Sequence, residues 1–218
     1  MPPVERLVCR FAAEPPQEAL PHGAWAQTLH AEFLAACLRI DAEGQELGEA
    51  RDLRWFPDRT WNGRTYVPVT AGTTTDLELF GCVSFIPGDP EEEGIGAEPS
   101  DFATRADFTE ETAARNPEWK IDICEEVVGS WRGEGGRDAE MTLVWGTPMI
   151  GRAVVATAEL AGLAVDQCLV RDDRFTLLAP DNYRGDFLDV KLWDSDGREL
   201  ASESLYVEDD EDEDAAAE

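Results

Sequence analysis

The chain has 218 residues, 43% of them hydrophobic, with seven Trp and nine Phe, so it can bury a substantial core as one large domain or two small ones. Its 47 acidic and 18 basic residues give a net charge of −29. This charge argues against direct binding of nucleic acid or an anionic membrane surface, because both are bound through clustered Lys and Arg. The partner we expect is another protein with a basic surface, although a salt-rich cytosol or a GC-rich genome also produces an acidic, arginine-rich composition.

The cysteines and the N-terminus indicate a cytoplasmic protein. Five cysteines are widely spaced, and no two form a CxxC pair. They occur in apolar settings, which predicts buried thiols in a reducing compartment rather than disulfides or a zinc site. The first residues include Glu5 and Arg6 and contain no long apolar run, so they predict neither a signal peptide nor a membrane anchor.

The first two elements are predicted to be strands. Residues 4–11 form the first, and a proline-rich connection follows. In residues 25–40 apolar side chains recur at a spacing of four, as in a helix, and also at a spacing of two, as in a strand. We interpret this segment as a strand, because residues 40–47 resemble residues 193–200 in type, position for position. Both segments are predicted to make the same hairpin turn.

Residues 60–117 contain a hairpin, a strand region and a long connection. Asn62-Gly63 is the strongest short hairpin signal, because both residues tolerate a positive φ. Residues 73–86 predict a strand pair or one long strand. Residues 87–117 hold four prolines, three glycines and many acids, which indicates a loop or linker. Within it we predict a short helix, with Asp107 as its N-cap and Glu110 reaching back to the first turn.

The second half of the chain is predicted to be rich in short strands. Strand-like sequence resumes at Trp119, breaks in a glycine-rich hairpin loop at residues 133–138, and continues in short β-type runs. The clearest hairpin is residues 187–207, where apolar residues alternate along the first arm and Asp194-Ser195-Asp196-Gly197 supplies the turn. A hairpin alone is marginally stable, so other strands must cover its apolar face.

These elements predict a mainly β fold, an antiparallel β-sandwich or barrel-like structure with little helix. The predicted organisation is a β-rich half in residues 1–90, an acidic Pro/Gly-rich linker or long loop in 91–117, and a second β-rich half in 118–207. The second half either stands alone or forms one domain with the first. Residues 208–218 contain eight acids in eleven positions and are predicted to be a disordered tail.

Catalytic motifs are weak. Ser130 lacks the glycine two positions earlier that GxSxG requires, because Val128 stands there. His22 and His30 are the only histidines, and each reads as an ordinary side chain. A pair of carboxylates for acid–base chemistry cannot be picked out among 47 acids.

Motifs for phosphates and metals are also incomplete. The glycines of residues 133–138 lack the third glycine of GxGxxG and a Walker lysine. Asp194, Asp196 and Gly197 match part of a calcium loop, but the turn accounts for the same residues. We therefore predict no enzymatic activity, no cofactor and no metal.

The remaining functional signal is a cluster of aromatic and arginine residues around a tight turn, in a protein otherwise short of positive charge. Such residues are the usual anchors of protein interfaces, although they also pack cores. The predicted binding residues, tail acids included, are Trp55, Phe56, Arg59, Trp61, Arg64, Tyr66, Asp209, Asp210, Glu211 and Asp212.

These features predict a non-enzymatic protein-binding module, such as an adaptor, an inhibitor or an immunity-type protein, that acts through an acidic surface. The alternatives are a subunit of a larger assembly, a nucleic-acid mimic that blocks a DNA-binding protein, and an enzyme of small molecules with an unrecognised site. The oligomeric state stays open.

Overall fold

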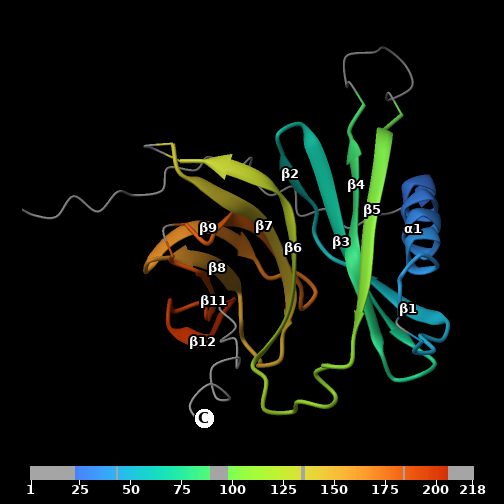
Figure 1. Ribbon diagram of the computed structural model, residues 1–218. Coiled ribbons are helices and arrows are strands. Elements are labelled where there is room, and N and C mark those ends of the chain that lie inside the picture. Colours follow the sequence, from blue (N-terminus) through green and yellow to red (C-terminus); the bar gives the residue numbers. More distant parts are fainter. Residues whose placement is uncertain (1–22, 43, 89–97, 134–135, 184, 206–218) are drawn as a thin grey trace, which may run out of the picture.

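The structure is a computed structural model, and it describes residues 23–42, 44–88, 98–133, 136–183 and 185–205. Within these ranges the chain forms one helix and twelve strands (Figure 1). In chain order they are α1 (Gly23–Cys37), β1 (Ala50–Trp55), β2 (Arg59–Trp61), β3 (Arg64–Thr73), β4 (Glu78–Ile86), β5 (Ser100–Thr109), β6 (Ile121–Arg132), β7 (Asp138–Pro148), β8 (Val155–Leu160), β9 (Leu163–Leu169), β10 (Phe175–Asp181), β11 (Leu188–Trp193) and β12 (Glu199–Ser204).

The strands form three antiparallel sheets. Sheet A has the order β1-β3-β4-β5, with β2 paired to β3; sheet B has the order β10-β7-β6; and sheet C has the order β12-β11-β8-β9. Helix α1 packs on one face of sheet A, sheet B packs on the other, and sheet C packs on the far face of sheet B. The predicted mainly β, antiparallel fold is confirmed, and its three sheets pack in the order A, B, C.

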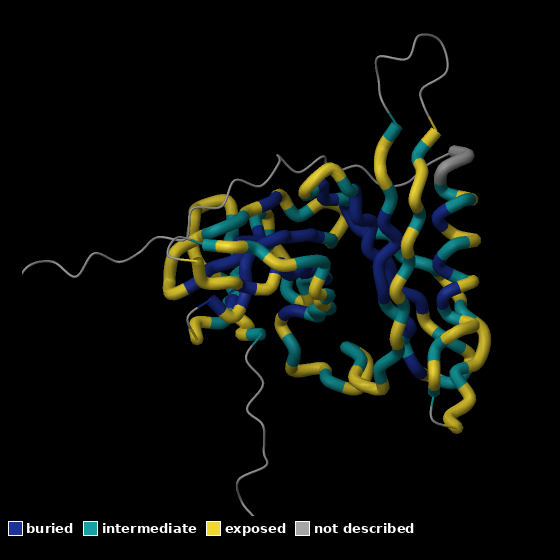
Figure 2. The backbone as a smooth tube through the Cα atoms, turned by 45° about the horizontal axis from the view of Figure 1, so that its top comes forward, coloured by how far each residue is buried: buried dark blue, intermediate teal, exposed yellow. Residues whose placement is uncertain are grey.

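Sheet B is apolar on both faces because it lies between two other sheets. In β7, Met141, Leu143 and Trp145 face sheet A, whereas Val144 faces sheet C. All four side chains are completely buried. Residues 141–145 of β7 are therefore apolar except for Thr142, which is close to the pattern of a strand covered on both faces. Figure 2 shows buried residues running along the inner strands, with the exposed residues mostly in loops and edge strands.

The predicted hairpin of residues 187–207 is confirmed over its described part, as β11 and β12. Leu188, Val190 and Leu192 are fully buried against the rest of the sandwich. In the turn, the Asp194 carboxylate accepts two backbone hydrogen bonds of 2.9 Å, and Gly197 has a φ of 74°. Asn62 and Gly63 likewise have positive φ values and join β2 to β3, so this predicted hairpin is also confirmed.

The predicted strand in residues 25–40 is wrong, because residues 23–37 form α1. Leu29, Phe33 and Ala36 are buried on one face of the helix, which is the spacing of four that competed with the spacing of two. The turn after it does form, with Gln45 N–H donating to the Ala42 carbonyl at 2.8 Å. It follows a helix, so it joins no hairpin.

The predicted loop in residues 87–117 is wrong for residues 100–109, which form β5 and pair with β4. Phe102, Ala106 and Phe108 pack toward the core of sheet A at a spacing of two, a pattern that the intervening charges obscured. The predicted helix does not form, and Asp107 instead accepts a hydrogen bond from the Phe108 N–H at 2.8 Å. The strand is therefore part of sheet A rather than of a linker.

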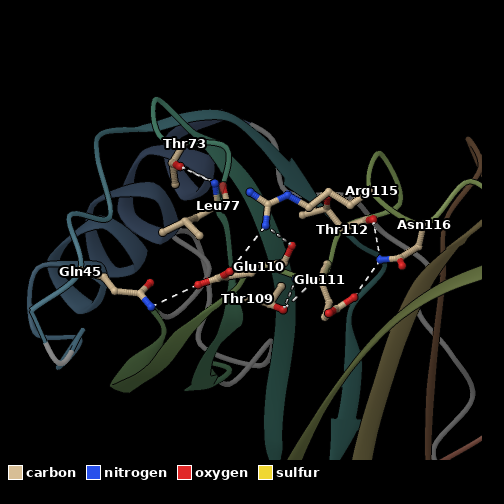
Figure 3. Close-up of polar contacts among 9 residues, drawn as sticks. All are labelled: Gln45, Thr73, Leu77, Thr109, Glu110, Glu111, Thr112, Arg115 and Asn116. Atoms are coloured by element: carbon tan, nitrogen blue, oxygen red, sulfur yellow. Dashed lines mark hydrogen bonds and ion pairs between the residues drawn. The ribbon is translucent and has the colours of Figure 1, made fainter.

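Polar contacts hold the connection between β5 and β6 (Figure 3). Arg115 donates to the Glu110 carbonyl at 3.1 Å, and the amide of Gln45 donates to the Glu110 carboxylate at 3.2 Å. The amide of Asn116 donates to the Glu111 carboxylate at 2.9 Å. The connection is thus tied to the loop that follows α1.

Two predictions concern residues that the structure does not describe. The first strand, residues 4–11, and the acidic tail, residues 208–218, lie outside the described residues. Within the described ranges, no helix is long and apolar enough to cross a membrane.

Candidate functional site

The predicted aromatic cluster is divided between the two faces of sheet A. Phe56 and Tyr66 are buried between sheets A and B, and Trp61 packs against the same cluster. Trp61 lies over Gly129 of β6, where any Cβ atom would collide with the indole ring. Trp55 lies on the opposite face and contacts Phe33 of α1, with ring centroids 6.4 Å apart. Most of this aromatic surface is therefore used inside the protein, and its role in binding stays a prediction.

Arg59, the most buried of the predicted residues, joins sheets A and C. Its side chain is 1% exposed and forms an ion pair with Asp166 of β9, which is 7% exposed. The same Asp166 oxygen accepts the backbone N–H of Leu178 in β10 at 2.7 Å. One carboxylate thus connects all three sheets, and Arg59 serves the fold.

Arg64 and Tyr66 line a hollow of about 240 Å³ beside β6, together with Arg105 and Glu126. Arg64 forms an ion pair with Asp101, and Arg105 forms one with Glu126. Both arginines of this hollow are therefore already paired with acids.

A second hollow, of about 140 Å³, contains acids that the sequence did not single out. Glu78 of β4 and Asp122 of β6 line it, with Arg54, Cys124 and Trp145. Burial, and then repulsion by Asp122, raise the pKa of Glu78 to about 7, while Arg54 opposes the shift. Burial also raises the pKa of Asp122 and of the Cys124 thiol. Glu78 can exchange a proton near neutral pH, whereas Cys124 is held as an unreactive thiol.

The largest of these hollows, about 390 Å³, lies at the open side of the sandwich, between edge strands β6 and β12. We call it the β6–β12 hollow. Its lining has four apolar side chains, two carboxylates and a hydroxyl, and neither Arg nor Lys. The lining residues are Trp119, Ile121, Ile123, Glu125, Glu203, Ser204 and Leu205.

The alternation of the two strands explains why these residues meet. Ile121 and Ile123 belong to the core between sheets B and C, and Glu125 follows two residues later on the same face of β6. In β12, Ala201 is buried in that core, and Glu203 follows two residues later. Each strand thus carries an exposed glutamate where its pattern calls for an apolar residue, at the point where the sandwich opens to solvent.

Acids on neighbouring strands act on Glu125. Partial burial of its side chain, and then repulsion by Asp181 and Glu140, raise the pKa of Glu125. A nearby cation stabilises the charged form of a carboxyl whose ionisation is opposed in this way, so the carboxyl favours the binding of a cation. The hollow therefore combines an apolar floor, an aromatic side chain and an acidic rim that favours a positive group.

The sequence did not identify this site. A signal was present in the run Ile121-Asp122-Ile123-Cys124-Glu125, where the third member of an apolar alternation is an acid. Glu203 was hidden because the second arm of its hairpin alternates less regularly. Only the arrangement of the sheets brings β6 and β12 together as neighbouring edge strands.

The other candidate residues either have structural roles or do not line the β6–β12 hollow. The Asp194 carboxylate caps backbone N–H groups of its own turn, and His30 is exposed on α1. Among the residues that the structure describes, no group of three or more His, Cys, Asp or Glu side chains is placed to hold a metal ion. The predicted tail residues Asp209, Asp210, Glu211 and Asp212 lie outside the described ranges.

Comparison with protein-family models, curated proteins and solved structures gives no match for this chain.

Proposed function

We propose that the protein is a non-enzymatic binding module that takes up a basic segment of another protein in the β6–β12 hollow. The observation that carries this proposal is the pair of glutamates, Glu125 and Glu203, at core-facing positions of two edge strands above an apolar floor. A Lys or Arg side chain placed between them meets two carboxylates, and its methylene groups cover the apolar floor.

Trp119 supplies an aromatic side chain to the same hollow. Tryptophan is enriched at the energetic centres of protein interfaces, and its ring attracts Lys and Arg cations. An extended segment that alternates basic and apolar residues places its basic side chains on one face, where their charged ends meet the glutamates and their methylene groups cover the apolar lining. The predicted partner, a protein with a basic surface, thus becomes a protein with a basic and apolar segment.

The rest of the surface supports the approach of such a partner. Exposed Asp and Glu side chains clearly outnumber exposed Arg and Lys in the described ranges, and they occur on all three sheets. A surface of this kind steers a basic partner over several ångströms, and salt weakens the effect. This distribution over all three sheets differs from the single rail of carboxylates that a nucleic-acid mimic requires.

The experiment is affinity purification from the native cell extract with three proteins that differ only in the position of a charge change. These are the wild type, Glu125→Lys/Glu203→Lys, and the control Glu46→Lys/Glu49→Lys, whose acids are exposed in the loop before β1. The two variants have the same net charge, so they lose long-range attraction equally.

We expect specific proteins to be retained by the wild type and by the control variant, but not by the Glu125→Lys/Glu203→Lys variant. Raising the salt concentration is expected to elute the retained proteins. Equal retention by all three proteins, or no specific retention by the wild type, would overturn the proposal. Thermal unfolding of each variant shows whether the fold survives.

A further inference from the structure

We propose that the basic segment binds as an extended β-strand added to the free edge of β6, with alternate side chains entering the β6–β12 hollow. This inference rests on the proposed function and specifies how the partner is held. It also specifies the partner's conformation, an extended segment rather than a helix.

Strand β6 is the last strand of sheet B. It is twelve residues long and pairs with β7 on one side. In the described part of the chain no strand pairs with its other side. An edge of this kind presents unpaired backbone N–H and C=O groups, which another strand can bond.

The direction of the backbone groups along β6 follows from one close contact. The carbonyl oxygen of Asp122 points toward β7, since a Cβ atom on Gly146 of β7 would collide with it. Backbone groups alternate in direction along an antiparallel strand. Asp122 and Cys124 therefore bond to β7, whereas Ile123 and Glu125 direct their N–H and C=O groups to the open side.

Contacts at the two ends of this stretch agree with that alternation. The carbonyl of Val127, the next residue of the outward series, accepts a hydrogen bond from Arg105 at 3.1 Å. The carbonyl of Lys120, in the inward series, accepts the N–H of Met149 at 2.9 Å, just beyond β7. Arg105 thus closes the edge at Val127, and the open stretch is residues 121–125.

The residues with outward backbone groups are also the residues that line the hollow. Ile121, Ile123 and Glu125 belong to both sets, because direction and face both alternate with a period of two. A strand that bonds to Ile123 and Glu125 places its own side chains above the same hollow. A basic residue opposite Glu125 makes a favourable cross-strand pair there.

The open stretch sets the size of the bound segment. Five residues of β6 span about 17 Å at roughly 3.4 Å per residue. A partner strand of five to eight residues covers this length. Chemically it alternates Lys or Arg with Val, Ile or another apolar residue.

The test uses a synthetic probe, acetyl-(Val-Lys)4-amide, and the same peptide N-methylated at alternate residues along the edge that would pair. N-methylation removes backbone donors and leaves every side chain and charge in place. We expect the unmethylated peptide to bind at least tenfold more tightly in low-salt buffer. Hydrogen exchange is the second readout, because a paired edge protects its outward amides.

In the exchange experiment the amides of Ile123 and Glu125 are expected to slow when the peptide binds. The amides of Asp122 and Cys124 serve as internal controls, because they are bonded to β7 with or without peptide. Equal affinity of the two peptides, with no new protection at Ile123 and Glu125, would overturn strand addition. If binding is then still lost in Glu125→Lys/Glu203→Lys, the hollow remains the binding site. If neither peptide binds the wild type, strand addition fails together with the proposed function.

A variant pair tests the same edge from the protein's side. Ile123→Pro removes one outward N–H and leaves the bonds to β7 intact, whereas Ile123→Ala removes side-chain volume and keeps the N–H. We expect the proline variant to lose at least tenfold in affinity for the unmethylated peptide and the alanine variant to lose clearly less. Equal losses would contradict the strand mode.

Discussion

Arg59 of β2 and Asp166 of β9 form an ion pair that is buried where the three sheets meet. Burial raises the pKa of Asp166, and Arg59 opposes that rise. Removing one partner of a buried pair leaves an uncompensated charge, so we expect Arg59→Met or Asp166→Asn to lower the free energy of unfolding by about 3 kcal/mol. Urea unfolding of the wild type and each variant measures this change in the free energy of unfolding.

The double variant Arg59→Met/Asp166→Asn is the control for that prediction. Asparagine keeps an oxygen that can accept the N–H of Leu178, and no charge is left buried. The double variant is expected to be more stable than the sum of the single effects implies. Strictly additive effects would show that the two side chains act independently.

Glu78 makes the stability of the fold depend on pH. Its pKa of about 7 in the folded protein lies above the value near 4.5 of an unperturbed group, chiefly because of burial and then because of Asp122, with Arg54 opposing. A raised acid pKa stabilises the fold below pH 4.5, and that contribution is lost as the pH rises to about 7. Because the Glu78 side chain is partly exposed to solvent, we expect this contribution to the free energy of unfolding to be on the order of 2 kcal/mol.

We therefore expect Glu78→Gln to be more stable than the wild type at pH 8 and similar to it at pH 4. Unfolding midpoints in urea across this pH range give the measurement. Glu46→Gln changes an exposed acid that does not line the hollow containing Glu78 and Asp122, and it is expected to leave the pH dependence of the unfolding midpoint unchanged. If the unfolding midpoints of the wild type and of Glu78→Gln differ by the same amount at every pH, Glu78 does not titrate in this range.

The turn Arg171-Asp172-Asp173-Arg174 contains two aspartates with positive φ, 49° and 57°, in a geometry that favours glycine at the second central position. We expect Asp173→Gly to stabilise the protein by about 0.5 to 1 kcal/mol. The backbone carbonyl that accepts from Arg54 is kept. Asp173→Asn isolates the loss of charge, and the reverse change in a similar turn, Gly63→Ala, is expected to destabilise. Destabilisation by Asp173→Gly would show that the carboxylate matters more than the backbone.

The acidic tail is expected to affect association more than dissociation. Ending the chain at Val207 removes eight acids and leaves a net charge of −21. Long-range attraction acts mainly on the association rate, so the truncated protein is expected to bind the Val-Lys peptide several-fold more slowly at low salt, with a similar dissociation rate. Stopped-flow fluorescence measures both rates. A large increase in the dissociation rate would place tail residues in the contact itself.

Local patterns predicted the hairpins well, because turn residues and alternation are encoded within a few positions. Asn62-Gly63 and Asp194 to Gly197 are examples. The segment 25–40 was misassigned because small residues such as Ala31 and Ala35 fit a spacing of two as well as the helix. Strand β5 was missed because Asp101, Arg105 and Asp107 on its exposed face obscured the alternation.

The hollows depend on contacts between distant segments, which local patterns do not contain. Glu78 and Asp122 meet because sheet A packs on sheet B, and Glu125 and Glu203 meet because two sheet edges are adjacent. The buried position of Arg59 likewise follows from an acid 107 residues away. Each of these residues looks like an ordinary surface charge until the sheets are assembled.

The most direct test of the central proposal is the dissociation constant of acetyl-(Val-Lys)4-amide, measured calorimetrically for three proteins at low salt. We expect Glu125→Lys/Glu203→Lys to weaken binding at least tenfold relative to Glu46→Lys/Glu49→Lys, although both variants carry the same net charge. We expect the dissociation constant of the control variant to stay within a few-fold of the wild-type value. Equal weakening in the two variants would show that the peptide responds to net charge alone, and would contradict a binding site between β6 and β12.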